Sequence, residues 1–353
     1  MQKILITGGA GFVGSNLALR FKQSRPAAEV IAFDNLRRRG SELILSRLRA
    51  GGVTFLHGDV RVREDLLAAG QVDLVVDCAA EPSVLAGRDG SPDYVIQTNL
   101  VGTVNCLELA RRCGADVVFL STSRVYPSAP INALKYREVE TRFQMLGQTV
   151  RGASEHGLAE DFPLEGSRSL YGASKLASEL LLEEYREAYG LRAVVNRCGV
   201  LTGPWQMGKV DQGVVVLWVA KHLYRGALSY IGFSGTGKQV RDILHVQDLY
   251  DLLEIQLGRI AEFDGSIFNV GGGTTISISL QELTALCREY TGNSIPIGAV
   301  PETRPQDLIC YLSDCRKVQA ATGWRAHHSP ESIIEEIARW ITDHRAELEP
   351  ILA

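Results

Sequence analysis

The stretch Lys3-Ile-Leu-Ile-Thr-Gly-Gly-Ala-Gly-Phe-Val-Gly14 decides the fold of this chain. Its apolar run, residues 4–6, is typical of a strand that is buried on both faces of a sheet. Gly8, Gly11 and Gly14 follow, and an apolar helical pattern begins at Phe12 and Val13. Glycine lets a backbone approach a pyrophosphate, and a helix N-terminus presents free N–H groups and a partial positive charge. The stretch therefore predicts a dinucleotide-binding strand, turn and helix, with an ordinary structural turn as the alternative.

An acidic residue stands where a dinucleotide-binding unit needs one. Residues 30–34 are typical of a second strand, and it ends in Asp34, twenty residues after Gly14. A carboxylate there can accept both hydroxyls of the adenosine ribose, and it would repel the 2′-phosphate of NADP. We therefore expect NAD as the cofactor. The basic run 37–39 leaves NADP as a minor alternative, although solvated surface is the simpler interpretation of these arginines.

The composition excludes several classes of protein. The chain has 353 residues, of which 45% are hydrophobic and 22% charged, and its formal net charge is −4. This is an ordinary globular composition, and it gives no electrostatic reason to expect nucleic acid or a membrane surface as partner. Seven scattered cysteines without a C-x-x-C pair predict reduced thiols rather than a disulfide framework or a metal site. Without a signal peptide or an apolar run of membrane-spanning length, we expect a cytoplasmic protein.

Strands and helices alternate along the first 200 residues. Apolar runs at 53–56, 74–77, 117–120 and 194–197 predict further strands, and helical patterns cover 41–49, 92–113 and 169–189. This alternation favours an α/β fold with a Rossmann-type, doubly wound parallel sheet. The polar stretch 127–169 is too long for a turn and predicts a lid or binding loop. We expect an NAD-binding domain at 1–200, to which 239–270 returns, and a smaller, mixed substrate lobe at 201–238 and 271–353.

Tyr171 and Lys175 lie four residues apart in a predicted helix, so they share one face. A phenol alone is a poor base at neutral pH, but a nearby ammonium group favours its phenolate form. The pair can then remove a hydroxyl proton while the neighbouring carbon loses hydride. A hydroxyl group from Ser121, Thr122 or Ser123 at the end of the fifth strand could bind the same substrate oxygen. Helix surface is the usual role of such a pair, but the preceding dinucleotide pattern favours catalysis here.

These motifs together resemble the extended short-chain dehydrogenase/reductase superfamily over nearly the whole chain. The resemblance rests on residues 7–14, Asp34-Asn35, Asn99, Ser121-Thr122, Tyr171-x-x-x-Lys175 and Gly203-Pro204. Within that superfamily the chain is most similar to the CDP-tyvelose 2-epimerase (CDP-paratose 2-epimerase) group. Three stretches carry this narrower resemblance: 135–142, 211–213 and 235–245.

The resemblance implies a role for individual residues. It implies Thr122, Tyr171 and Lys175 as the catalytic residues. For NAD it implies the residues Gly8, Gly11, Phe12, Val13, Gly14, Asp34, Asn35, Leu36, Asp59, Val60, Ala79, Ala80, Asn99, Ser121, Tyr171, Lys175 and Arg197. For the substrate we expect Glu81, Ser123, Arg124, Cys198, Gln212, Gln239, Arg241, Arg304 and Asp307. Of these, Arg241 matches an arginine that meets the pyrophosphate, and Arg304 and Asp307 match positions near the nucleotide phosphate and ribose.

Two positions depart from the patterns of the superfamily. Its 4,6-dehydratases carry Thr-Asp-Glu where this chain has Thr122-Ser123-Arg124. Dehydration needs a proton donor and a base beside C5 and C6, and serine and arginine are poor substitutes. Asp77-Cys78 replaces the usual apolar or His-Leu pair before the alanines, where we expect little effect beyond the local cofactor contacts.

The resemblance implies an NAD-dependent nucleotide-sugar epimerase, an isomerase of carbohydrate biosynthesis. We expect inversion at C2 of a CDP-linked or related (deoxy)hexose, through a transient keto-sugar to which bound NADH returns the hydride. A 4-epimerase of the UDP-hexose type is the alternative; a 4,6-dehydratase or a non-catalytic nucleotide-binding protein is less consistent with the motifs. The resemblance also implies a homodimer or homotetramer that associates through the helices at 92–113 and 171–189.

Overall fold

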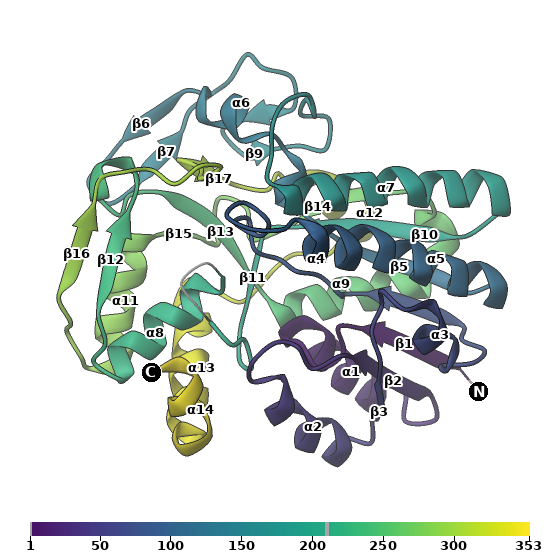
Figure 1. The fold of residues 1–353 in the computed structure, drawn as a ribbon. Coiled ribbons are helices and arrows are strands. Elements are labelled where there is room, and N and C mark those ends of the chain that lie inside the picture. The colour runs from purple at the N-terminus through teal and green to yellow at the C-terminus, as the bar shows by residue number, and fades with distance from the viewer. Residues whose placement is uncertain (1, 209–211) are drawn as a thin grey trace. The chain divides into compact units, whose positions relative to one another are not determined.

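The central element of the computed structural model, which describes residues 2–208 and 212–353, is a seven-stranded sheet (Figure 1). The strand order is β14-β10-β5-β4-β1-β2-β3. The strands are β1 (Lys3–Thr7), β2 (Glu29–Asp34), β3 (Thr54–His57), β4 (Leu74–Asp77), β5 (Asp116–Thr122), β10 (Ala193–Cys198) and β14 (Ile267–Val270). The pairs from β3 through β5 are parallel, and Thr7 lies in register with both Phe33 and Asp77. The predicted Rossmann-type parallel sheet is confirmed.

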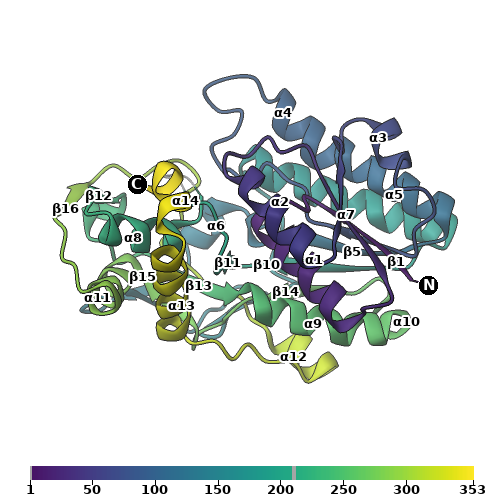
Figure 2. The ribbon, with the colours of Figure 1, turned by 90° about the horizontal axis from the view of Figure 1, so that it is seen from below.

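Alternating side chains of the strands bury both faces of this sheet. On one face Leu5, Phe33 and Phe119 pack in a single cluster with the helices α3 (Arg63–Leu67), α5 (Gly102–Cys113) and α7 (Leu170–Tyr189). On the other side lie α1 (Phe12–Ser24) and α9 (Val246–Gly258) (Figure 2). The rings of Phe21 and Tyr250 from these two helices meet edge to face. Two buried faces explain the nearly continuous apolar strands, because such runs are typical of parallel sheets covered by helices.

The predicted helix at 92–113 is present but is not a uniform α-helix. It consists of α4 (Asp93–Ile96), a π-helical turn (Gln97–Val101) and α5. A Cβ atom at Gly102 would lie 2.8 Å from Cγ2 of Val60, so glycine permits close packing where α5 begins. Single π-turns within helices are frequent at functional sites, and this one carries Asn99.

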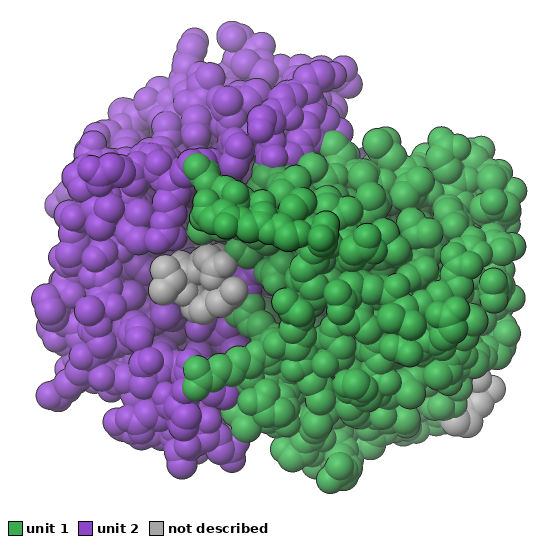
Figure 3. Space-filling model, viewed as in Figure 1, with its two compact units in different colours: residues 1–125, 169–197, 250–268 green, residues 126–168, 198–249, 269–353 purple. Residues whose placement is uncertain are grey.

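The chain divides into two compact units (Figure 3). Unit 1 consists of residues 1–125, 169–197 and 250–268, and unit 2 of residues 126–168, 198–249 and 269–353. Unit 1 also contains α2 (Ser41–Ala50) and α10 (Ile260–Phe263). The helices of unit 2 are α6 (Ser128–Asn132), α8 (Val214–Leu223), α11 (Leu280–Thr291), α12 (Arg316–Thr322), α13 (Pro330–Asp343) and α14 (Arg345–Leu352).

The strands of unit 2 form small sheets. One joins β11 (Val200–Thr202), β13 (Val240–His245), β15 (Ser277–Ser279) and β17 (Cys310–Tyr311), and another pairs β12 (Leu228–Ile231) with β16 (Ile297–Val300). The polar stretch 127–169 contains two short antiparallel pairs, β6 (Tyr136–Glu138) with β7 (Phe143–Met145) and β8 (Ala153–Ser154) with β9 (Gly157–Leu158). This connection is therefore partly ordered into strands rather than an irregular loop throughout.

All seven cysteines are free thiols, and five of them are buried. Burial raises the pKa of the Cys287 thiol and, together with nearby Asp77, that of Cys106. Such thiols are poor nucleophiles, because the thiolate is the reactive form. No helix among residues 2–208 and 212–353 has the length and apolar character to cross a membrane.

Candidate functional site

The turn after β1 has the close packing that a phosphate cradle requires. Gly8 has a positive φ of 62°, and a Cβ atom at Gly14 would lie 2.2 Å from the carbonyl oxygen of Gly8. Gly11 is the N-cap of α1, whose first turn has neither a side-chain cap nor an acidic residue. The N–H groups of this helix end thus face no competing carboxylate of their own helix. These features fit a dinucleotide pyrophosphate, with Phe12 and Val13 supplying the first helical N–H groups.

Asp34 lies at the end of β2 and helps to hold the glycine turn. Its carboxylate accepts the N–H of Ala10 at 3.1 Å and the N–H of Leu36 at 2.7 Å. Burial raises the pKa of Asp34, although both backbone bonds oppose this shift. Each carboxylate oxygen has a second lone pair that can accept a ribose hydroxyl. Arg37, which could have favoured NADP, stacks 3.7 Å from the ring centroid of Tyr94.

The residues beyond Asp34 form a second polar group at the ends of β2 and β3. Asn35 donates to Oδ2 of Asp59 at 2.9 Å, and Arg61 pairs with the same carboxylate at 2.7 Å. This bond from Arg61, above all, lowers the pKa of Asp59 to about 2. Asn105 holds the carbonyl of Val60 at 2.9 Å. The structure therefore holds Asp59 next to Asn35 and fixes the backbone of Val60, at the sheet edge where adenosine binding stays a prediction.

Asp77, one of the two departures from the expected pattern, has a structural role. Its buried carboxylate accepts hydroxyl bonds from Thr7 at 2.7 Å and Thr103 at 2.9 Å. The Thr7 hydroxyl oxygen in turn accepts the N–H of Ala79 at 3.2 Å. Asp77 thus links β1, β4 and α5 and fixes the segment that begins with Ala79 and Ala80. This network satisfies a buried charge that would otherwise be costly.

Asn99 fixes the backbone of Glu81 rather than being directed only toward a ligand. Its side-chain oxygen accepts the N–H of Glu81 at 2.7 Å, and its amide nitrogen donates to the Glu81 carbonyl at 3.1 Å. The same nitrogen donates to the Ser174 hydroxyl on α7 at 3.1 Å. Asn99 is fully buried. It therefore connects the segment after β4 to the helix that carries Tyr171 and Lys175.

The expected catalytic side chains all belong to unit 1. Tyr171 and Lys175 lie one turn apart on α7, which packs against β5 and against the short helical turn that follows it. Thr122 ends β5, and its hydroxyl accepts the N–H of Arg124 at 3.1 Å. Lys175 is 1% exposed, and its ammonium lies 3.9 Å from the ring centroid of Phe119. Such burial keeps water from competing for the ammonium and suits a group that stabilises a neighbouring phenolate.

Glu179 has a role in the site that the sequence did not predict. It accepts Nη2 of Arg197 at 2.7 Å and Nε of the same guanidinium at 3.1 Å, and the Ser121 hydroxyl also donates to it. Ser121 and Arg197 were predicted to contact the cofactor, yet both are engaged by this buried carboxylate. Glu179 follows Lys175 by four residues, so its place on the buried face of the predicted helix was the available signal.

Some of the expected substrate residues come together in unit 2. Arg241, on β13, donates through Nη2 to Oδ1 of Asp307 at 2.7 Å, and the Asp307 N–H reaches the Arg304 carbonyl at 3.2 Å. Gln239 donates to the Ile231 carbonyl at 3.0 Å, while its own Oε1 is buried without a partner among the described residues. The structure thus assembles one cationic fork, one carboxylate and one amide oxygen near the start of β13.

The other expected substrate residues do not take part in the hydrogen bonds of Arg241, Asp307 and Gln239 described above. Ser123 and Arg124 form the short helical turn after β5, and Cys198 ends β10 as a buried thiol. Gln212 directly precedes Gly213, the N-cap of α8. Asp211, from the stretch 211–213, lies outside the described residues.

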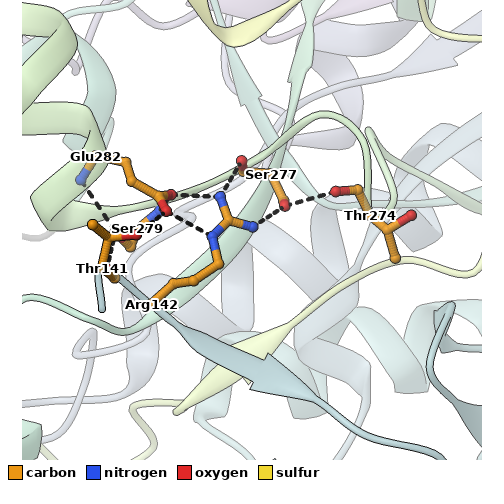
Figure 4. Close-up of polar contacts among 6 residues, drawn as sticks. All are labelled: Thr141, Arg142, Thr274, Ser277, Ser279 and Glu282. Carbon is orange, nitrogen blue, oxygen red and sulfur yellow. Dashed lines mark hydrogen bonds and ion pairs between the residues drawn. The ribbon is translucent and has the colours of Figure 1, made fainter. Parts of the chain in front are cut away.

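Arg142, in the stretch 135–142 that supported the narrower resemblance, bonds to both Glu282 and Ser277, and we call these contacts the Arg142 clamp (Figure 4). Arg142 donates through Nε to Oε1 of Glu282 at 2.7 Å, and its two terminal nitrogens reach the hydroxyl and the carbonyl of Ser277, each at 3.0 Å. Glu282 also closes the capping box of α11 with Ser279. The guanidinium is therefore used to hold the β6–β7 hairpin against α11, which explains a specific arginine here without assigning it to a ligand.

Comparison with known proteins covers nearly the whole chain. Residues 4–271 match the sequence model described as the NAD dependent epimerase/dehydratase family. A CDP-paratose 2-epimerase of Salmonella typhi is 32% identical over 96% of this chain and 99% of its own length. A dTDP-glucose 4,6-dehydratase of Streptomyces antibioticus is 29% identical over 99% of this chain and 95% of its own.

A solved structure shares both the fold and part of the sequence. The UDP-glucose 4-epimerase of Thermus thermophilus, in complex with NAD, superimposes with a TM-score of 0.77 and is 27% identical. The match covers 97% of this chain and 99% of that one. The sequence relatives and this solved structure therefore match residues of unit 2 as well as of unit 1.

Proposed function

Because the chain belongs to the NAD dependent epimerase/dehydratase family, we propose that it is a nucleotide-sugar 2-epimerase acting on a CDP-linked or related deoxyhexose. The relative at 32% identity, which matches over 99% of its length, is named CDP-paratose 2-epimerase. Unit 2 contributes Arg241 for the pyrophosphate and Asp307 for the nucleotide ribose. A guanidinium fork suits phosphate oxygens, and its pairing with Asp307 keeps it oriented.

Each residue of the catalytic set has a distinct role in this proposal. Tyr171, as phenolate, accepts the proton of the C2 hydroxyl group, and the buried ammonium of Lys175 stabilises that phenolate. Thr122 binds the same hydroxyl oxygen and fixes its orientation. NAD, held by the turn at Gly8 to Gly14 and by Asp34, would supply the hydride chemistry at the sugar carbon, with hydride returned to the opposite face. Tyr171 then gives back the proton, so the reaction has no net redox change.

One observation carries the choice of epimerisation over dehydration. Ser123 and Arg124 occupy the turn after Thr122, and the Arg124 N–H donates to the Thr122 hydroxyl. This turn offers no carboxyl group beside the catalytic threonine, whereas loss of water from C5 and C6 requires both an acid and a base there. A solved dTDP-glucose 4,6-dehydratase shares the fold with a TM-score of 0.79, but this turn lacks the Asp-Glu pair that the dehydratase pattern implies after the threonine.

Inversion at C4 of a UDP-hexose is the second candidate, since one of the structural neighbours is a UDP-glucose 4-epimerase. The same Tyr171, Lys175 and Thr122 could serve that reaction with the sugar bound in a different orientation. The carbon that faces the nicotinamide would decide between the two.

Incubation with CDP-, UDP-, dTDP- and GDP-linked sugars in deuterated water, followed by NMR, tests the proposal. We expect inversion at C2 of a CDP-sugar, with the original C–H hydrogen retained at that carbon. Solvent deuterium at the inverted carbon would contradict hydride return, and inversion at C4 of a UDP-sugar would replace the proposed substrate with the second candidate.

A further inference from the structure

Unit 2 contains a cluster of imidazoles and carboxylates for which the proposed reaction has no use. Asp248, in the first turn of α9, is fully buried. Its Oδ1 lies 2.7 Å from Nδ1 of His327 and 2.8 Å from Nδ1 of His328. Its Oδ2 accepts the backbone N–H of His328 at 3.2 Å. The His328 ring contacts those of His327 and His245 in tilted arrangements, at centroid distances of 4.3 and 4.2 Å. Glu336 lies 3.2 Å from Nε2 of His245.

Two overlapping sets of ligand atoms within this cluster are close enough to bind one ion. One set is His245, His328 and Glu336, and the other is Asp248, His327 and His328; in each set the atoms lie within 4.8 Å of one another. Two nitrogen donors and one oxygen donor suit a borderline divalent ion such as Zn²⁺, Co²⁺ or Ni²⁺ rather than Mg²⁺ or Ca²⁺.

A hydrogen bond that His245 accepts shows which of the two sets of ligand atoms can bind a metal ion. The Gln247 N–H donates to Nδ1 of His245 at 3.2 Å, so the neutral ring carries its hydrogen on Nε2, the atom that faces Glu336. A metal-binding imidazole needs the reverse arrangement, a bare nitrogen toward the metal and an N–H on the other side. His245 therefore presents an N–H rather than a bare nitrogen toward Glu336, 3.2 Å away, and it is not a ligand.

We propose that Asp248, His327 and His328 form a binding site for a divalent transition-metal ion, with Zn²⁺ as the natural candidate. The metal replaces the hydrogens that the two Nδ1 atoms share with Oδ1 of Asp248. Each neutral ring shifts its hydrogen to Nε2, so the exchange needs no additional proton donor or acceptor. Three protein ligands leave a fourth position for water.

The surroundings allow this exchange. Zinc bonds of about 2.0–2.1 Å separate tetrahedral ligand atoms by about 3.3 Å, so the distances from Oδ1 of Asp248 to both rings must lengthen by about half an ångström. The His327 side chain is 60% exposed and can move outward, and it also provides the entry path for the ion. The carboxylate of Asp248 or the His328 ring must shift by a similar amount.

The metal would connect two segments that are about 80 residues apart in the sequence. Asp248 belongs to the start of α9, whereas His327 and His328 precede α13. Binding to the folded state alone would raise the stability of the whole chain by mass action.

Zinc titration of the full-length, chelator-treated protein tests the proposal, followed by calorimetry and by thermal unfolding. We expect one saturable site per chain, a raised melting temperature with Zn²⁺, and tetrahedral absorption bands when Co²⁺ is used instead. His327→Gln should weaken zinc binding about tenfold or more. Its melting temperature without metal should stay close to that of the wild type, since this side chain is exposed.

Two variants serve as controls. His156→Gln removes another exposed histidine of unit 2, which lies 4.0 Å from Glu155, and it should bind zinc like the wild type. Glu336→Gln should retain most of the affinity. Absence of saturable binding, or equal affinity in His327→Gln, would overturn the site. Loss of binding in Glu336→Gln with binding intact in His327→Gln would also overturn it, in favour of the other set of ligand atoms.

Discussion

Glu179 accepts both Nε and Nη2 of Arg197, at 3.1 and 2.7 Å, in an ion pair whose side chains are only 3% and 4% exposed. The pair joins α7, which carries Tyr171 and Lys175, to β10 in the same unit. Its carboxylate also accepts the Ser121 hydroxyl, one residue before Thr122. In the proposed mechanism Glu179 would be a positioning residue, because its buried side chain holds both the helix and the strand end that bear the proposed catalytic groups.

Glu179→Gln should lower both stability and turnover. Removal of one partner from a buried pair costs about 3–5 kcal/mol, because the remaining guanidinium is left uncompensated. We expect kcat to fall about tenfold with a smaller change in KM, because small misplacements of reacting groups cost rate. Urea unfolding and steady-state kinetics measure the two effects. Glu183→Gln, one turn further along α7 with its side chain 52% exposed, should resemble the wild type in both assays.

Tyr171→Phe removes the proposed base without altering the packing of α7. General bases contribute about 10²–10⁴-fold, so turnover of the nucleotide sugar should fall by that factor. The unfolding midpoint and the amount of NAD retained through purification should stay unchanged. Tyr189→Phe, on the same helix with Tyr189 58% exposed, is the matched control. Full turnover by Tyr171→Phe would show that another group removes the proton.

Gly14→Ala should disrupt the glycine turn, because the new Cβ would lie 2.2 Å from the Gly8 carbonyl oxygen. Either that oxygen or the start of α1 must move, and both shape the pyrophosphate cradle. We expect loss of copurifying NAD and a lower unfolding midpoint. Gly258→Ala is the matched substitution at the end of α9, where a Cβ has open space. There alanine should be neutral or stabilise by up to about 1 kcal/mol. Normal NAD content in Gly14→Ala would mean that the cofactor does not depend on this close contact.

The sequence predicted the parts of this protein that depend on local pattern. The glycine turn, the apolar strands and the i, i+4 pair Tyr171 and Lys175 are short-range features, and the strands and helices at these positions are confirmed. The π-helical turn before α5 was not predictable, because the apolar pattern of residues 92–113 does not distinguish a π-helical turn from a continuous α-helix.

Hydrogen-bonded residues that are far apart in the sequence could not be matched with one another before the fold was known. Arg142 and Glu282 are 140 residues apart, and neither position has a local signature that selects the other. His327 and Asp248 meet only when the segment before α13 lies against the start of α9. The expectation that the chain has no metal site rested on cysteine spacing, which does not detect such a cluster.

The stability that the Arg142 clamp provides should depend on the forked shape of the guanidinium group and not on its charge alone. Arg142→Lys keeps the positive charge but cannot make the forked bonds to Glu282 and Ser277. We expect a loss of about 1–3 kcal/mol in unfolding free energy and faster proteolysis within 135–145. Arg137→Lys, on the same hairpin with one exposed bond to Gln144, should show neither effect. A lysine variant as stable and protected as the wild type would show that charge alone suffices.

Asp242 gives unit 2 a pH dependence whose sign is fixed by its burial. Burial raises the pKa of this carboxyl to about 6, against the opposing bonds from Ser313 and the Gly273 N–H. Because the folded pKa exceeds the unfolded value of about 3.9, the protonated group stabilises the fold below pH 4, and this stabilisation is lost as the pH rises through 6. A shift of about two units corresponds to about 3 kcal/mol. Asp242→Asn should therefore gain stability relative to the wild type between pH 4 and 7, measured by urea unfolding, whereas exposed Asp343→Asn should follow the wild type throughout. Parallel curves for Asp242→Asn and the wild type would show that this carboxyl titrates normally.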